Sequence, residues 1–213
     1  TQGDVPIHYT LDGSEPTAAS PRYTGPVEIG KSARFRATAL REGGENASYS
    51  REFAFSKSTG RPAVLNTKPN DSYTFEGASL LVDGYHSRPV FTSGAWLGYL
   101  DEPLDVTIDM GGEQSYRSVE LETLAEKGDW IFPPSSVTVW VSDNGTDFTE
   151  VASVAVPEAK AGDADGIGRY RMQFPETSAR YLKVVAQNAA AIPAWHPGAG
   201  SKGFLFVDEV VVE

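Results

Sequence analysis

Short runs of alternating apolar and polar residues recur along almost the whole chain, and they limit its possible folds more than any other feature. In the clearest run, four apolar residues alternate with three polar ones, namely Leu104, Val106, Ile108 and Met110 with Asp105, Thr107 and Asp109. A period of two places successive side chains on opposite faces of a strand. Gly, Pro, Asn and Asp separate the runs, and helical periodicity is nearly absent. The pattern therefore predicts an all-β chain.

The runs form two groups, which predicts two domains. Strands of the first domain are expected over residues 5–10, 27–29, 33–41 and 47–56, with Asp12-Gly13 as a turn. A sheet of only four strands buries little core and leaves an edge exposed. We therefore expect that the chain begins inside a longer protein and that the first part of this domain lies upstream of residue 1. The small, polar residues that follow are broken by Gly and Pro. We predict domains over 1–57 and 67–213, joined by a linker over 58–66.

The second group predicts a sandwich or jelly roll. Beyond the run at 104–110, strands are expected over residues 116–123, 137–141, 148–156, 170–174, 180–187 and 204–212. Asp143-Asn144-Gly145 is the strongest turn signal, because Asn and Gly tolerate the positive φ that a tight hairpin requires. Residues 85–103 and 188–202 are longer than a hairpin needs. Long loops on a rigid sandwich often carry function.

Charge and composition exclude several classes of function. The formal net charge of −11 opposes binding to phosphate backbones, so nucleic acid is not an expected partner. No apolar run approaches the length of a membrane span, and no membrane insertion is expected. The chain contains no Cys, which excludes disulfides, thiolate metal sites and a Cys nucleophile. The three histidines, at positions 8, 86 and 196, are too widely spaced to indicate a zinc site.

The last predicted strand carries two adjacent acids. Regular alternation would put Glu209 on the face of Leu205 and Val207, and Asp208 on the face of Phe206. At least one acid would then face apolar neighbours. A buried carboxylate normally neutralises, pairs with a cation or binds a metal, so the strand indicates an ion site. The alternative is an edge strand with one face in water.

Residues 7–29, IHYTLDGSEPTAASPRYTGPVEI, resemble the C-terminal β-domain of chitobiases and β-hexosaminidases. This resemblance implies a small immunoglobulin-like or fibronectin-like sandwich. The second domain resembles the coagulation factor 5/8 type C, or discoidin, domain, whose bacterial relatives include family 32 carbohydrate-binding modules. The motifs that carry this second resemblance are LLVDGYH, VTIDMG, VWVSDNGTDFTEV, ARYLKVVAQN and VDEVVVE. It implies a discoidin-like β-sandwich jelly roll of the galactose-binding type.

The order of the two domains, with WIFPPSSV and AWHPGAGSKGFLFVDE in the second, resembles the tail of a family 20 glycoside hydrolase, a β-N-acetylhexosaminidase. Such a parent would be secreted, periplasmic or on the cell surface. The His-x-Gly-Gly-Asp-Glu motif of the catalytic barrel in that family is absent. The only Asp-Glu pairs begin at Asp101 and Asp208, and adjacent strand residues should point to opposite faces. We therefore expect no catalysis from this chain alone.

The discoidin resemblance also implies a structural Ca²⁺ ion, with Asp83 and Glu209 as the matching ligands. Backbone carbonyl groups near residues 81–86 would complete the oxygen shell that Ca²⁺ requires. The sequence departs from the commoner pattern, which has Asn and Thr around the positions of His86 and Ser87. The alternative is that Glu209 pairs with Arg88 or Lys202 and that Asp83 caps a turn.

Sugar binding needs an aromatic face against a pyranose, with polar groups nearby to bind its hydroxyls. The candidates are aromatic and polar residues of the predicted loops, namely Trp195, His196, Trp130, Tyr85, His86 and Arg88. Packing is the alternative role for Trp130 and also for Trp96, because both lie beside apolar residues. Trp140 alternates with two valines, so it should face away from the core.

Two functions remain open. The chain could be a carbohydrate-binding module that holds its parent enzyme on glycans with terminal N-acetylhexosamine or galactose. It could instead be a scaffold whose loop aromatics pack against the catalytic domain of the parent, because Trp and Tyr are enriched at interfaces. Glycans and that catalytic domain are therefore the expected partners, and Ca²⁺ is the expected cofactor.

Overall fold

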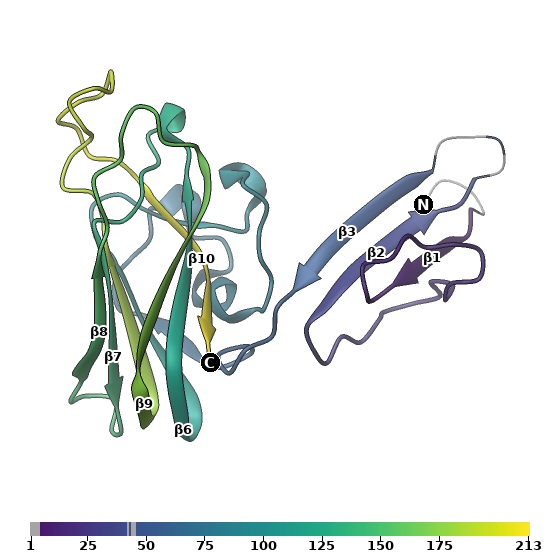
Figure 1. Ribbon diagram of the computed structural model, residues 1–213, viewed down its shortest axis with the longest axis horizontal. Coiled ribbons are helices and arrows are strands. Elements are labelled where there is room, and N and C mark those ends of the chain that lie inside the picture. The colour runs from purple at the N-terminus through teal and green to yellow at the C-terminus, as the bar shows by residue number, and fades with distance from the viewer. Residues whose placement is uncertain (1–4, 42, 44–45) are drawn as a thin grey trace. The chain divides into compact units, whose positions relative to one another are not determined.

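The computed structural model describes residues 5–41, 43 and 46–213, and it divides the chain into two compact units, Thr1–Phe55 and Ser56–Glu213 (Figure 1). The described residues form strands, short 3₁₀ turns and loops, with no α-helix among them. The prediction of an all-β chain is confirmed. No helix in the described part of the chain is long and apolar enough to cross a membrane.

The first unit contains one antiparallel sheet in the order β1-β2-β3, with β1 over Ile7–Thr10, β2 over Ala33–Ala39 and β3 over Ala47–Phe53. Aromatic rings from all three strands pack on one face. The ring centroids of Tyr9 and Phe35 are 5.9 Å apart, and those of Phe35 and Tyr49 are 6.4 Å apart. Such aromatic pairs stabilise a sheet beyond the area that they bury.

The strand predicted over residues 27–29 is not present. The free edge of β1 pairs instead with an earlier segment, in which Tyr23 N donates to Ile7 O and Tyr9 N donates to Pro21 O. The predicted run lies between Pro26, which has no N–H to donate, and Gly30. It is too short between these breaks to sustain a ladder of hydrogen bonds.

The second unit is a sandwich built from seven strands. They are β4 (Ala63–Leu65), β5 (Leu97–Tyr99), β6 (Leu104–Ala125), β7 (Ser136–Ser142), β8 (Thr149–Ala155), β9 (Gly166–Gln187) and β10 (Leu205–Val212). Four 3₁₀ turns lie between them, namely η1 (Asp71–Tyr73), η2 (Gly77–Val82), η3 (Phe91–Ser93) and η4 (Lys127–Asp129). The strand order is β5-β10-β6-β9-β7-β8, and β4 pairs with β6.

Strands β6 and β9 each contribute to both layers of the sandwich. Near Leu104 and Ala186, β6 pairs with β4 and β9 pairs with β7. In the other paired halves, near Leu121 and Tyr170, β6 pairs with β10. Each strand was predicted as two. The ladder continues through a register shift around Gly111, which has φ +79°, so the break indicated by the sequence is a bulge within one strand.

Apolar side chains from both layers fill one main core. Leu104, Val106, Ile108 and Met110 are all buried there, as their alternation predicted. A second, smaller cluster lies elsewhere in the unit and contains Trp96, which is fully buried as its apolar surroundings indicated. Together the two clusters make the second unit a well-packed support for its loops.

The segment predicted as a linker is packed against the second unit instead. Ser58 is fully buried, and its hydroxyl donates to Val210 O over 2.5 Å. Residues 63–65 form β4, in which Ala63 and Leu65 pack on the core while Val64 is 61% exposed. A three-residue edge strand is too short to show a period-two pattern, which explains the error.

The alternation predicted for β10 is also wrong. Val207 pairs with Thr123 and Val210 pairs with Leu121, so β10 has one extra residue between these two pairs. This bulge returns Val210 to the core face already occupied by Val207, and it leaves both intervening acids buried. Asp208 and Glu209 therefore reach the same segment of the chain and do not point to opposite faces.

The core and the edge strand yield a matched test of packing. We expect Val106→Ala to lower the free energy of unfolding by about 2 kcal/mol, because it removes buried methyl groups and leaves a cavity. Val64→Ala makes the same chemical change at an exposed position and should alter stability by less than about 0.5 kcal/mol. Urea unfolding measures both, and equal losses would contradict this assignment of the core.

Candidate functional site

Two loops lie side by side at one end of the second unit. One follows β6 and contains η4, and the other spans residues 188–203, drawn in yellow in Figure 1. Backbone hydrogen bonds join them where Phe204 N donates to Trp130 O over 2.8 Å and Phe132 N donates to Phe204 O over 2.9 Å. This pairing brings Trp130 close to the segment that carries Trp195 and His196.

His196 is the centre of an aromatic cluster. Its ring lies 6.0 Å from that of Trp130, 5.5 Å from that of Phe132 and 5.6 Å from that of Trp195, in near-perpendicular arrangements. Each distance joins ring centroids. Such edge-to-face geometry is favourable for aromatic rings.

The imidazole of His196 is buried, and both of its nitrogens have backbone partners. Gly198 N–H donates to Nδ1 over 3.0 Å, so Nδ1 is unprotonated in this arrangement. Nε2 must then carry the proton, which it donates to Lys127 O over 2.9 Å. His196 therefore connects the two loops as a neutral side chain. It packs against the neighbouring aromatic rings, and its direct contact with a sugar stays a prediction.

Trp130 is held in an unusual backbone conformation. Its φ is +64°, a value that bulky side chains rarely adopt, and its side chain is 42% exposed. The indole lies against Gly198, where an added Cβ would come within 2.8 Å of the ring. Surrounding structure must stabilise such a conformation, and residues of this kind concentrate at functional sites.

Trp195 is 40% exposed and is fixed at one edge. Its Nε1–H donates to Ala159 O over 3.0 Å, so the polar atom of the indole is already satisfied by the protein. The exposed part of the side chain can therefore make apolar contacts without leaving an unpaired donor. Phe132, Ala159 and Gly198 also contact this aromatic cluster. None of them was predicted from the sequence, and the only signal that could have found one is the Gly-rich segment 198–203.

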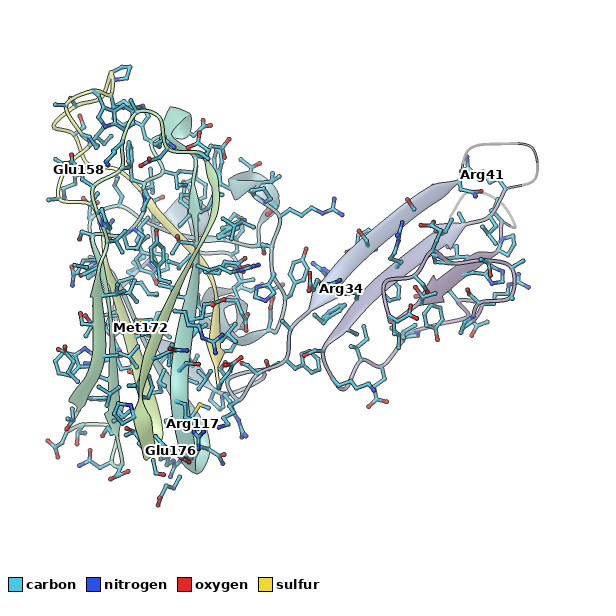
Figure 2. The ribbon with its side chains drawn as sticks, viewed as in Figure 1. Arg34, Arg41, Arg117, Glu158, Met172 and Glu176 are labelled. Atoms are coloured by element: carbon cyan, nitrogen blue, oxygen red, sulfur yellow. The ribbon has the colours of Figure 1, made fainter. Side chains whose placement is uncertain are left out.

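A cavity of about 410 Å³ lies beside this cluster and is lined by residues 132–135, 156–159 and 189–194. A second hollow of about 480 Å³ shares Pro157, Glu158, Ala159 and Ala194 with it and is also lined by Trp195. Glu158 is the only ionisable side chain among the described residues that line the first cavity. Figure 2 shows Glu158 at this end of the unit, opposite the end that carries Arg117 and Glu176.

An ion pair anchors the loop that carries Trp130. Lys127 is buried and pairs with Asp165, whose carboxylate also accepts from Lys127 N over 3.1 Å. The hydrogen bond from Lys127 holds the pKa of Asp165 below its ordinary value. With its charge paired in this way, Lys127 contributes to the position of the loop.

The other predicted sugar-binding residues form a second group. Nδ1 of His86 lies 2.9 Å from Oε2 of the buried Glu122, and Arg169 Nε donates to the same oxygen over 2.8 Å. The contact with Glu122 raises the pKa of His86. Burial acts to raise the pKa of Glu122, but the hydrogen bonds from His86 and Arg169 hold it below its ordinary value. The buried Glu122 is thus paired with the partly buried His86 and the exposed Arg169.

The two groups are anchored at different points of β6. The second group contacts Glu122, and the loop of the aromatic cluster begins at Glu126, just before η4. These two residues are four positions apart, or about 13 Å along a strand. Within the second group, Arg88 O accepts from Trp96 Nε1 over 3.0 Å, and Tyr85 N donates to Asp83 Oδ1 over 2.7 Å. The structure thus brings Trp130, Trp195 and His196 together and places His86 of the second group against Glu122, at another point of β6.

Of the two predicted metal ligands, Glu209 lies at the bulge of β10 and Asp83 directly follows η2. Gly84 N is 3.2 and 3.3 Å from the two carboxylate oxygens of Glu209, and Ser87 N donates to Asp208 Oδ2 over 2.8 Å. Burial, with the charges of Asp83 and Asp208, raises the pKa of Glu209 to about 10. Burial raises the pKa of Asp208 to about 8.

The alternative to a metal site was that Asp83 caps a turn and that Glu209 pairs with Arg88 or Lys202. Asp83 caps a turn through its bond from Tyr85 N, as the alternative expected. Lys202 pairs with Asp101 over 2.7 Å and is not the partner of Glu209. In the described part of the chain, no three His, Cys, Asp or Glu side chains are grouped so as to hold a metal ion.

The contact between Gly198 and the indole can be tested directly. Gly198→Ala should displace Trp130, change the tryptophan fluorescence and lower the free energy of unfolding by about 1 to 3 kcal/mol through overpacking. Gly128→Ala is the matched control, because a Cβ at that position would meet no atom within 4 Å. An unchanged spectrum and stability in Gly198→Ala would contradict the proposed packing.

Two family models match the chain. Residues 1–53 match the model named Fn3 associated, and residues 66–202 match the F5/8 type C domain. No curated protein matches the chain.

Many solved structures resemble it. Chitosan-binding module 1 from a chitosanase/glucanase of Paenibacillus sp. IK-5 has 16% identity and a TM-score of 0.47, and the match covers 74% of this chain and 98% of the module. A Streptococcus pneumoniae fucose binding module has 22% identity and a TM-score of 0.46, with coverage of 74% and 94%. A Clostridium perfringens module in complex with GalNAc-β-1,3-galactose has 16% identity and a TM-score of 0.46, with coverage of 71% and 93%.

Proposed function

This chain belongs to the F5/8 type C domain family, and we propose that its second unit is a carbohydrate-binding module. One observation carries the proposal: two exposed indoles, Trp130 and Trp195, are fixed around His196 beside a cavity of about 410 Å³. Aromatic rings offer large apolar surface at a low cost in side-chain entropy. The apolar face of a pyranose fits such a surface, and nearby polar groups bind its hydroxyls.

The proposed ligands are glycans that end in N-acetylhexosamine or galactose. The sugar ring would lie against Trp195, whose N–H is already bonded to Ala159 O. Glu158, Lys160 and the loop backbone supply the polar contacts around it. Because the rings are held in place before the ligand arrives, little conformational entropy is lost on binding.

We further propose that the chain is a non-catalytic C-terminal region of a β-N-acetylhexosaminidase that acts on glycans outside the cytoplasm. The order of the two matched segments and the motifs WIFPPSSV and AWHPGAGSKGFLFVDE support this parent. In such an enzyme the module would hold the catalytic domain close to its substrate and raise the effective substrate concentration.

A packing role is the competing function, and one observation favours it. Alanine and proline dominate the lining of the cavity, and exposed indoles beside an apolar surface are also typical of protein interfaces. In that role the loops would pack on the catalytic domain of the parent. The two functions differ in whether the isolated chain binds sugar.

A glycan array on the chain, followed by calorimetry on each hit, tests sugar binding. We expect saturable binding to a defined terminal sugar and at least a tenfold loss in Trp195→Ala, because the change removes apolar contact area whose burial contributes on the order of 1.5 to 3 kcal/mol. Trp140→Ala is the control, since Trp140 lies on β7 under Lys183, outside both hollows. No binding across the array by well-folded protein would contradict the module and favour packing.

We also propose a structural Ca²⁺ ion at Asp83 and Glu209. The donor set fits a hard cation, because Glu209 is a fully buried carboxylate that is close enough to Asp83 and Asp208 to feel their charges. A cation there would offset the desolvation of the carboxylates. Because the described residues hold no group of three His, Cys, Asp or Glu side chains arranged around a metal ion, backbone carbonyl oxygens would supply the remaining ligands.

Chelation tests the ion. With free Ca²⁺ at about 100 times its Kd, the ion adds about 2.7 kcal/mol, and we expect chelator to lower the melting temperature by roughly 5 to 10 °C. Glu209→Gln should make melting insensitive to chelator, whereas Glu150→Gln, at an exposed position of β8, should leave the sensitivity intact. An identical melting curve with and without chelator would contradict the site.

A further inference from the structure

We propose that the 410 Å³ cavity binds the N-acyl group of an amino sugar whose ring lies on Trp195, an inference that rests on the proposed carbohydrate-binding function. The cavity and the hollow beside Trp195 share Pro157, Glu158, Ala159 and Ala194. A sugar over the indole can therefore direct one substituent into the cavity.

The chemistry of the lining determines which substituent fits. Alanine, proline, valine, isoleucine and phenylalanine form the walls, and Glu158 and Ser135 are the only polar side chains among the described lining residues. A bare hexose would bring several hydroxyl groups to walls with few side-chain partners, and each group left unpaired costs about 1 to 3 kcal/mol. An acyl chain instead presents apolar carbon to the walls and a single amide to the rim.

The charge of the site narrows the choice further. Glu158 opposes anionic substituents such as sulfate or carboxylate, and no basic side chain lines the cavity in the described residues. An ammonium group would leave water for walls whose side chains are apolar apart from Ser135 and Glu158, and Glu158 itself is exposed and already solvated. A neutral acyl group meets neither obstacle.

The size of the cavity leads to a dependence on acyl length. Its volume exceeds what an acetyl methyl fills, because the walls consist largely of small residues such as Ala190 and Ala191. Each further methylene that enters should raise affinity, by up to about fourfold, from the transfer of apolar surface out of water. The gain should end when the cavity is full.

The test measures calorimetric binding of methyl glycosides that share one ring, in both the glucosamine and galactosamine series. The probes are the free amine, the N-acetyl, N-propionyl and N-glycolyl forms and the parent hexose. We expect the N-acetyl form to bind at least tenfold more tightly than the amine or the hexose. The N-propionyl form should bind at least as tightly as N-acetyl, and the N-glycolyl form should bind more weakly because it buries an extra hydroxyl.

A cavity-filling variant gives a second readout. Ala190→Leu should remove the preference for the acyl forms while the chain stays folded, because the added side chain occupies the space. Ala199→Leu is the matched control, since Ala199 is an exposed alanine of the same loop that does not line the cavity. The control should keep the acyl preference.

The possible results distinguish the acyl site from the carbohydrate-binding function on which it rests. Equal affinity for acylated and bare sugars, or tighter binding of the free amine, would overturn the acyl site and leave the carbohydrate-binding module standing. No binding of any sugar by folded protein would overturn both. An acyl preference that Ala190→Leu does not change would also overturn the cavity as its origin.

Discussion

The antiparallel pairing of β6 with β9 is the interaction on which the second unit depends. Each strand takes part in both layers, so one ladder sets their separation and register. The end of β6 leads directly into η4, where Lys127 is buried against Asp165 and offers its carbonyl to His196. The position of the aromatic cluster is therefore determined by the same hydrogen bonds that hold the core, and a rigid support of this kind is what a binding site requires.

Period-two alternation predicted the strands wherever it is regular, as at Leu104–Met110, because one face of each strand meets the core. It failed at bulges. Gly111-Gly112 resembles a turn in the sequence but lies within β6, and one extra residue between Val207 and Val210 reverses the expected faces of β10. Both errors share one physical cause, since a bulge changes the register through pairing with a partner strand that local sequence does not encode.

The candidate site was predictable in part. Aromatic residues in long loops led to the prediction of Trp130, Trp195 and His196, and the structure places their rings together. The role of His196 was not predictable, because it depends on Lys127 O and Gly198 N, which only the folded chain brings to its ring. The cavity was missed for the same reason. Its lining comes from three distant segments in which alanine and proline have the appearance of ordinary loop residues.

The rigidity of the cluster has an energetic origin that links it to the core. A bulky residue at positive φ, such as Trp130, costs about 1 to 3 kcal/mol, which neighbouring contacts must offset. Gly198 provides the space for the indole, and the neutral imidazole of His196 holds both loops. The fold thus bears the cost of ordering the rings before any ligand arrives. In the proposed module, binding would then cost little conformational entropy.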